Sequence, residues 1–387
     1  MLLSRRMGAA RQLLSPLGLA LALIGAALFF GGGAGGGSIL WLGAAAVALA
    51  VVLAATHEVP GRLLALLPLG ALTVWCGASI AWSIEPDRSW DYANRTAVYV
   101  AFAVVGAFLA ARTGELALGL SGLLAAVCVW ALAAKIFPAL YEDYGRIARL
   151  RAPVGYWNAL ALLGDIALPL GLWLAGRRRI AGTLLVYGWV VAIALTYSRG
   201  GVVVGFVIVV AWIALSGGWI AGTTTLFAAG VPAALVIGAA FSLHGVASDA
   251  QSHSTRAHDG LIFGAALVAG AVLAAGLTRL PAPAPTRGLR TMAAVLAGVI
   301  AVVGIAVAIA RANSWWHEFT SPAAPELSNS QSRFVDAGSN HRWVWWKESW
   351  DAFEHHAVAG TGAGSFAFTI RWVRVDTFVV ANQYLPA

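Results

Sequence analysis

Charged side chains are scarce in this sequence, since Asp, Glu, Lys and Arg together make up 11% of the 387 residues. A soluble domain carries about 25% charged and about 45–50% apolar residues, whereas 60% of this chain is hydrophobic. So few charged groups cannot cover a water-facing surface, which excludes a soluble enzyme, a disordered protein and a fibrous protein. The composition therefore predicts a polytopic membrane protein, long enough for about ten to twelve spans.

Cysteine is also scarce. The two cysteines, Cys76 and Cys128, lie in apolar stretches, and the chain has no Cys-x-x-Cys or Cys/His spacing of a metal site. The net charge of +8 does not indicate nucleic-acid binding, because the compact basic run at 177–179 lies between two apolar stretches. Such a run is typical of a signal for membrane topology. We therefore expect neither a disulfide framework nor a nucleic-acid partner.

Apolar stretches of about 15–23 residues indicate membrane helices. Basic residues in the short loops favour a cytoplasmic N-terminus. The sequence therefore predicts an all-α bundle of about eleven transmembrane helices over residues 1–310, and an extracytoplasmic segment over 311–387 whose tryptophans lie at the membrane interface. The eleven predicted spans lie near 13–30, 38–55, 63–82, 96–111, 115–134, 157–175, 180–197, 201–215, 219–241, 260–277 and 292–310.

The junction between the seventh and eighth spans combines a helix N-cap with an arginine. Ser198 suits the N-cap, and Gly200 and Gly201 let a bulky ligand approach the first turn of the next helix. Free N–H groups and the positive end of the helix dipole favour an anion there, and Arg199 adds a planar fork that matches phosphate oxygens. The pattern predicts either an anion site or a short turn whose arginine reaches lipid headgroups.

The loop before the sixth span carries Arg146, Arg149 and Arg151 within six positions. Crowded like charges are costly unless an anion neutralises them, so this loop predicts a bound anion or attraction to anionic headgroups. Asn158 and Asp165 follow on the next helix, and their spacing of two turns places them on one face. Asp165 lies on the order of 10 Å into the membrane, where an ionisable residue faces a cavity or hydrogen-bonds to a neighbouring helix.

Two more polar segments follow less specific patterns. The mixed charges at 83–95 favour a solvated loop, and helical spacing places Arg342, Trp346 and Trp350 on one face of an amphipathic helix. Gly-Thr-Gly-Ala-Gly at 360–364 lacks the strand and lysine of a phosphate-binding loop and predicts a turn after that helix. No metal is expected, because the histidines of this segment lack metal-ligand spacing with carboxylates. These histidines are His341, His355 and His356.

Taken in this order, the motifs resemble the O-antigen ligase / O-antigen polymerase (Wzy-type) membrane family. The resemblance is strongest over 146–387. In the first hundred residues it consists only of the hydropathy profile and the tryptophan-containing loop at 82–86. The corresponding motifs are WSIEP at 82–86, RLRAPVGYWNALALL at 149–163, LTYSRGG at 195–201, and RxxxW, FxxH and GTGxGxF within 342–366.

The resemblance implies a GT-C-like helical bundle in a bacterial cytoplasmic (inner) membrane. It also implies transfer of a glycan from an undecaprenyl-pyrophosphate carrier to a hydroxyl of a glycan, lipid or protein acceptor on the periplasmic or outer face. On this resemblance Arg199, Arg342 and, less directly, Arg151 contact the pyrophosphate. No cofactor is expected, because arginine forks can stabilise the leaving diphosphate without a metal. The residues expected to support the site are Ser198, Gly200, Asn158 and Asp165.

The family's histidine, the proposed general base, falls beyond Ala387, as do its last spans. We therefore expect a truncated chain whose catalytic group is missing. Ligase and polymerase differ in the acceptor, which leaves no short motif. The alternative functions are a transporter or flippase of a lipid-linked glycan, whose arginines guide the anion without bond formation, and a non-catalytic membrane scaffold.

Overall fold

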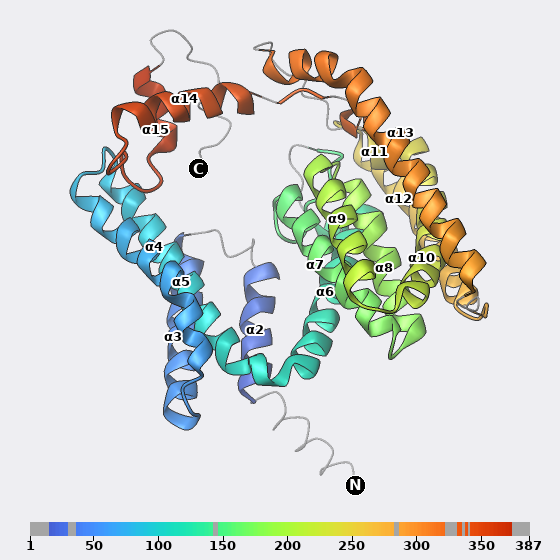
Figure 1. Ribbon diagram of the computed structural model, residues 1–387, viewed down its shortest axis with the longest axis horizontal. Helices are drawn as coiled ribbons and strands as arrows, with labels where there is room; N and C mark the ends of the chain where they lie inside the picture. Colours follow the sequence, from blue (N-terminus) through green and yellow to red (C-terminus); the bar gives the residue numbers. More distant parts are fainter. Residues whose placement is uncertain are drawn as a thin grey trace.

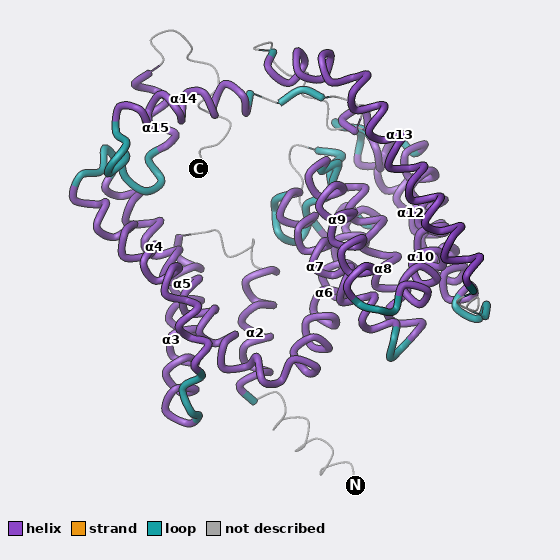
Figure 2. Tube along the Cα trace, viewed as in Figure 1, coloured by secondary structure: helices purple, strands orange, loops and turns teal. Residues whose placement is uncertain are grey.

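The computed structural model describes residues 15–29, 36–141, 146–281, 286–321, 331–334, 337–339 and 341–373. Within these ranges every regular element is a helix and none is a strand (Figure 2). The predicted all-α class is therefore confirmed.

The helices cover the predicted apolar stretches, although the helix over Pro86–Leu109 begins well before the predicted span 96–111, and the helix over Arg287–Thr320 extends beyond both ends of 292–310. In chain order they are α2 (Pro16–Phe29), α3 (Gly36–Thr56), η2 (Gly61–Leu66), α4 (Leu67–Ala78), η3 (Ser79–Ala81), α5 (Pro86–Leu109), η4 (Ala110–Arg112), α6 (Thr113–Ile136), η5 (Pro138–Leu140), α7 (Trp157–Ala175), α8 (Arg179–Leu195), α9 (Arg199–Leu215), α10 (Trp219–Ser242), α11 (His244–Ala247), α12 (His253–Leu277), α13 (Arg287–Thr320), η6 (Gln331–Phe334), α14 (Arg342–His355) and α15 (Phe366–Val373).

Six helical segments of the described chain are long and apolar enough to cross a membrane, which supports a multi-pass membrane protein. One of them contains two predicted spans, 96–111 and 115–134, which η4 separates at Ala110–Arg112. The six segments are Gly37–Thr56, Gly61–Ala81, Pro86–Ile136, Trp157–Ala175, Trp219–Ser242 and His253–Leu277.

The other predicted spans fall on helices outside these six segments. Predicted spans 13–30, 180–197 and 201–215 coincide with the shorter apolar helices α2, α8 and α9, which have 14, 17 and 17 residues. The last span, 292–310, lies within α13. The count of eleven spans therefore goes beyond the six that meet the length and hydropathy requirement.

The helices pack around two apolar cores. The smaller core lies between α2, α3 and α5, and includes Leu17, Leu53 and Val105. The larger core lies among α6, α7, α8, α10 and α12, and includes Trp189 and Phe263. Figure 1 shows the two groups of helices, with α2 and α6 between them. The larger group carries the loops that form the candidate site.

Glycines let α7 and α8 approach at backbone distance. A Cβ atom at Gly182 would overlap the backbone nitrogen of Ala175 and would lie 2.5 Å from the carbonyl oxygen of Gly171. Small residues at such contacts are typical of helix pairs in membranes. This contact fixes the distance between α7 and α8, and α9 in turn packs on α7.

The C-terminal segment begins inside a helix. Because α13 continues to Thr320, the domain boundary expected at 310/311 falls within it. A helix is present over the predicted stretch as α14, on which Arg342, Trp346 and Trp350 are exposed and Glu348 is buried. The ring centroids of Trp316 on α13 and Trp343 on α14 are 5.2 Å apart. In Figure 1 α14 and α15 lie over the ends of α4 and α5.

We expect Gly182→Ala to separate α7 from α8 and to lower the free energy of unfolding by about 1–3 kcal/mol, the usual cost of overpacking. Unfolding of the detergent-solubilised protein measures this difference. Gly238→Ala on α10 is the matched control, since no atom lies within 4 Å of its Cβ position. Alanine at Gly238 is expected to preserve or raise stability, because its helix propensity exceeds that of glycine. Equal unfolding free energies for the two variants would contradict this packing model.

Candidate functional site: an arginine-lined cavity

The N-terminus of α9 has the capped geometry that the sequence predicts. Ser198 is the N-cap, and its Oγ accepts a hydrogen bond of 3.2 Å from the backbone nitrogen of Gly201. The preceding residue, Tyr197, has a φ of 50°, in the left-handed region. Its ring packs at 5.7 Å from that of Phe241 and 5.8 Å from that of Phe334. These aromatic contacts hold the backbone in a conformation that non-glycine residues rarely adopt.

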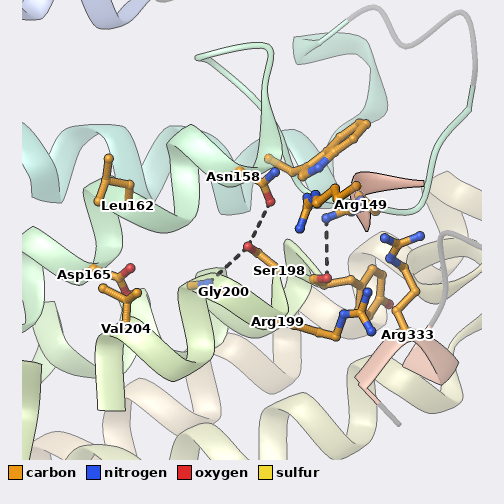
Figure 3. Close-up of a pocket in the computed structure, with 13 residues that line it drawn as sticks. Arg149, Asn158, Leu162, Asp165, Ser198, Arg199, Gly200, Val204 and Arg333 are labelled. Carbon is orange, nitrogen blue, oxygen red and sulfur yellow. Dashed lines mark hydrogen bonds between the residues drawn. The ribbon is translucent and has the colours of Figure 1, made fainter. Parts of the chain in front are cut away.

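A short hydrogen-bond chain connects the first turns of α7 and α9. The Ser198 hydroxyl donates to Asn158 Oδ1 at 2.9 Å (Figure 3). Asn158 Nδ2 donates to the Tyr156 hydroxyl at 2.6 Å. Asn158, expected to support the site, therefore orients the N-cap residue directly. Both helices begin at the same end of the bundle.

Arg149 joins the loop before α7 to the end of α8. Its Nε donates to the carbonyl oxygen of Thr196 at 2.8 Å, and its Cζ lies 4.1 Å from the ring centroid of Trp157. The backbone beside it is paired too, since Leu150 N donates to Leu195 O at 2.8 Å. Although it is charged, Arg149 is only 5% exposed.

A cavity of about 250 Å³ opens between these loops and the first turns of α7 and α9. Four of its lining side chains are arginines, and the single acidic one is Asp165. Figure 3 shows Arg149, Arg199 and Arg333 toward one end, and Leu162, Asp165 and Val204 toward the other. The cavity is lined by Arg149, Trp157, Asn158, Leu162, Asp165, Tyr197, Ser198, Arg199, Gly200, Gly201, Val204, Arg333 and Arg342.

The charges of this cavity act on one another. Burial lowers the pKa of Arg149, and the positive charges of Arg333, Arg342 and Arg199 lower it further, against an opposing contribution from Tyr156. The neutral form of a cation is favoured where its charge is desolvated and crowded. The negative charge of a bound anion would favour the charged form of Arg149 and offset the repulsion among the arginines, so this end of the cavity is suited to a multiply charged anion.

Tyr197 does not supply that negative charge. Burial raises the pKa of its phenol, and Asp249 raises it further. The hydroxyl is buried and has no hydrogen-bond partner within the described part of the chain. A neutral phenol cannot compensate the arginine charges.

The structure brings together two of the three arginines expected to contact pyrophosphate, Arg199 and Arg342, and leaves the third apart. Arg151 instead borders a separate small cavity, with its Cζ 5.8 Å from the ring centroid of Tyr141. The chain turns at Arg151, whose carbonyl oxygen accepts a hydrogen bond of 2.8 Å from the nitrogen of Gly155. The expectation that Arg151 shares the hollow of Arg199 and Arg342 is therefore corrected.

Two arginines that the resemblance did not assign take part in the cavity. Arg149 belongs to the crowded loop that the sequence marked as a possible anion site. Arg333 had no such signal, because η6 is a short element in a polar segment. Its neighbour Phe334 packs on Tyr197 and lies 6.4 Å from Phe241, which brings Arg333 to the cavity. Long-range aromatic packing of this kind leaves no local sequence pattern.

The remaining predicted residues also border the cavity. Gly200 is exposed, and in the described part of the chain no atom lies within 4 Å of its Cβ position, which leaves the first turn of α9 open. Arg199 Nη2 donates to the carbonyl oxygen of Gly338 at 2.8 Å. This bond connects α9 to the segment that leads into α14 and Arg342, which is exposed.

The glycine-rich turn after α14 contacts a segment that is distant in the sequence, the loop before α5 and the first turn of α5. Trp82 Nε1 donates to Ala359 O at 2.9 Å, and the Ser89 hydroxyl donates to Ala363 O at 2.9 Å. Ala363 N in turn donates to Ser79 Oγ at 3.1 Å. The mixed-charge segment at 83–95, expected as a solvated loop, is helical from Pro86 onward and partly contacts residues 359–364. None of residues 359–364 is among the described residues that line the arginine cavity.

We expect Arg199→Lys to weaken the binding of inorganic pyrophosphate at least tenfold, which corresponds to about 1.4 kcal/mol. Lysine lacks the planar fork that can bind Gly338 and a phosphate oxygen together. The rise in melting temperature with pyrophosphate concentration measures the affinity. Arg177→Lys is the control, because Arg177 lies beyond the other end of α7, over Trp173. The same pyrophosphate response in wild type and Arg199→Lys would contradict the prediction.

We expect Gly362→Ala to detach the turn from the loop before α5. A Cβ at Gly362 would lie 2.5 Å from Ser83 Cβ and 2.8 Å from Ser83 Cα. Hydrogen exchange at residues 79–92 should then accelerate. Gly360→Ala is the matched control, because Gly360 has a positive φ of 66° like Gly362 (106°) but no neighbour within 4 Å. Faster exchange in both variants would indicate backbone strain instead of lost docking.

Among the described residues, no three His, Cys, Asp or Glu side chains gather closely enough to hold a metal ion. Comparison with protein-family models, curated proteins and solved structures gives no match.

Proposed function

We propose that this protein transfers a glycan from an undecaprenyl-pyrophosphate carrier to an acceptor hydroxyl at the outer face of a bacterial cytoplasmic membrane. The observation that carries the proposal is a cavity beside the apolar helices α7 and α9. Four arginines line it: Arg149, Arg199, Arg333 and Arg342. A lipid-linked diphosphate combines a multiply charged head with an apolar tail. The arginine-lined cavity suits the charged head, and the surrounding membrane suits the apolar tail.

The size of the cavity supports a headgroup as the ligand. Sites that enclose a whole drug-sized ligand have volumes of about 300–1,000 Å³, whereas this cavity has about 250 Å³. A diphosphate and the adjoining part of one sugar suit this volume, and the rest of the glycan would extend outward. The acceptor can then be another glycan, a lipid or a protein.

The chemistry of the reaction fits guanidinium groups. Negative charge develops on the diphosphate as the bond to the sugar breaks, and fixed donors aimed at such charge lower the barrier. Arginine forks can bind two phosphate oxygens at once and remain charged when the anion is bound. Four of them from separate segments hold the leaving group without a metal cofactor.

In the same proposal α2, α8, α9 and α13 complete an eleven-span, GT-C-like bundle with a cytoplasmic N-terminus. The loops before α7 and α9 then both face the periplasm. The hydrogen bonds between Arg149 and Thr196, and between Ser198 and Asn158, support a common side for these loops. The exposed tryptophans of α14, Trp346 and Trp350, suit the membrane interface.

The test uses the full chain in proteoliposomes with lipid-linked glycans and acceptors extracted from cells that carry the gene. Wild type should release undecaprenyl pyrophosphate and form the glycan–acceptor product. Arg199→Lys and Arg342→Lys should each reduce the rate of release about 100-fold, as loss of a donor to developing charge does. Arg177→Lys should retain the wild-type rate.

Two results would contradict the proposal. Unimpaired transfer by Arg199→Lys would remove the arginine cavity from the reaction. Passage of the intact lipid-linked glycan across the bilayer without bond formation would instead support the transporter alternative.

A further inference from the structure

Asp165 is a buried carboxylate at the inner part of the arginine cavity. It lies on α7, it is 1% exposed, and it lines the cavity directly. Its Oδ1 has no hydrogen-bond partner within the described ranges of the chain. The sequence left two alternatives for this residue, a cavity-facing role or a hydrogen bond to a neighbouring helix. The cavity position and the unpartnered oxygen favour the first.

The close packing of α9 against Asp165 makes this arrangement specific. A Cβ at Gly205 would lie 2.7 Å from Asp165 Oδ1, so α9 can approach the carboxylate only because residue 205 is glycine. Burying a carboxylate oxygen without a hydrogen-bond donor is costly. Retaining such a group at a cavity wall is typical of a site that meets the polar group of a ligand.

Asp165 and the arginines occupy different ends of one hollow. Figure 3 shows Asp165 beside Leu162 and Val204, away from Arg149, Arg199 and Arg333. Along α7, Asp165 lies two turns, on the order of 10 Å, from Asn158 at the mouth. An in-line displacement requires the leaving group and the incoming hydroxyl on opposite sides of the reacting carbon.

We propose that Asp165 is the general base that accepts the proton of the acceptor hydroxyl. This inference rests on the function proposed above and supplies a proton acceptor within the described chain. The acceptor oxygen forms a bond to the anomeric carbon of the first sugar, and its proton passes to a carboxylate oxygen of Asp165. The bond from that carbon to the diphosphate oxygen breaks, and its electron pair leaves with the undecaprenyl pyrophosphate that the arginines hold. The carboxyl group later returns the proton to water.

The step requires the acceptor hydroxyl within hydrogen-bond distance of Asp165, about 2.8 Å, and about 3–3.5 Å from the reacting carbon, with the leaving diphosphate on the opposite side. The anomeric configuration should therefore be inverted in the product. A single carboxylate on the far side of the anomeric carbon is not expected to give a product with retained configuration, by hydrolysis or by transfer.

The deciding variant is Asp165→Asn, which preserves shape and cannot accept the proton. In the proteoliposome assay its turnover should fall at least 100-fold, while its affinity for added undecaprenyl pyrophosphate stays within twofold of wild type. Its melting temperature should be no lower than that of wild type, because an unpartnered buried carboxylate is lost. Should Asp165→Asn fail to fold, Asp165→Ser removes the same carboxylate with a smaller side chain and is measured in the same way.

The matched control is Thr183→Val on α8. Thr183 is also 1% exposed, and its Oγ1 has no hydrogen-bond partner among the described residues, but Thr183 is not among those that line the cavity. Its turnover should stay within twofold of wild type. Wild-type turnover in Asp165→Asn, or a parallel loss of turnover and undecaprenyl pyrophosphate affinity, would overturn the role of Asp165 while leaving the transfer function intact. No release of undecaprenyl pyrophosphate by wild type would instead refute the transfer function itself, and this inference with it.

Discussion

The repulsion among four arginines around one small, partly desolvated cavity is the constraint on which the account depends. Like charges brought together in a low-dielectric setting raise the free energy of the folded state unless an anion joins them. Burial first, and then the charges of Arg333, Arg342 and Arg199, lower the pKa of Arg149, the most buried of the four. Relief of this repulsion when a multiply charged anion binds therefore contributes to the binding free energy.

The scaffold that holds these arginines is assembled from segments distant in the sequence. Glycine contacts set the spacing of α7 and α8, and a Ser–Asn–Tyr hydrogen-bond chain joins the first turns of α7 and α9. The polar segment beyond α13 is attached at Phe334, at Gly338 and at the turn after α14. The first two attachments lie on the larger helix group and the third lies on the group of α4 and α5, so the position of Arg342 depends on the packing of both groups.

Sequence reasoning succeeds where a signal is local. Apolar runs located the helices, the N-cap pattern located Ser198 and Arg199, and helical spacing located α14 with Trp346 and Trp350. It fails where tertiary contacts decide. Arg151 and Arg149 are two positions apart in one arginine-rich loop, yet Arg149 lines the cavity of Arg199 and Arg342 whereas Arg151 borders only the smaller cavity, which Arg149 also reaches.

Other features lay beyond any local pattern for similar reasons. Arg333 reaches the cavity because Phe334 packs on Tyr197 and Phe241, which are far away in the sequence. The length of a helix depends on its capping and packing as well as on hydropathy, so α8 and α9 are shorter than ordinary spans. The account is tested most directly by an experimental structure of the protein with undecaprenyl pyrophosphate. It predicts diphosphate density between Arg149, Arg199, Arg333 and Arg342, whereas density bound elsewhere with this cavity unchanged would contradict it.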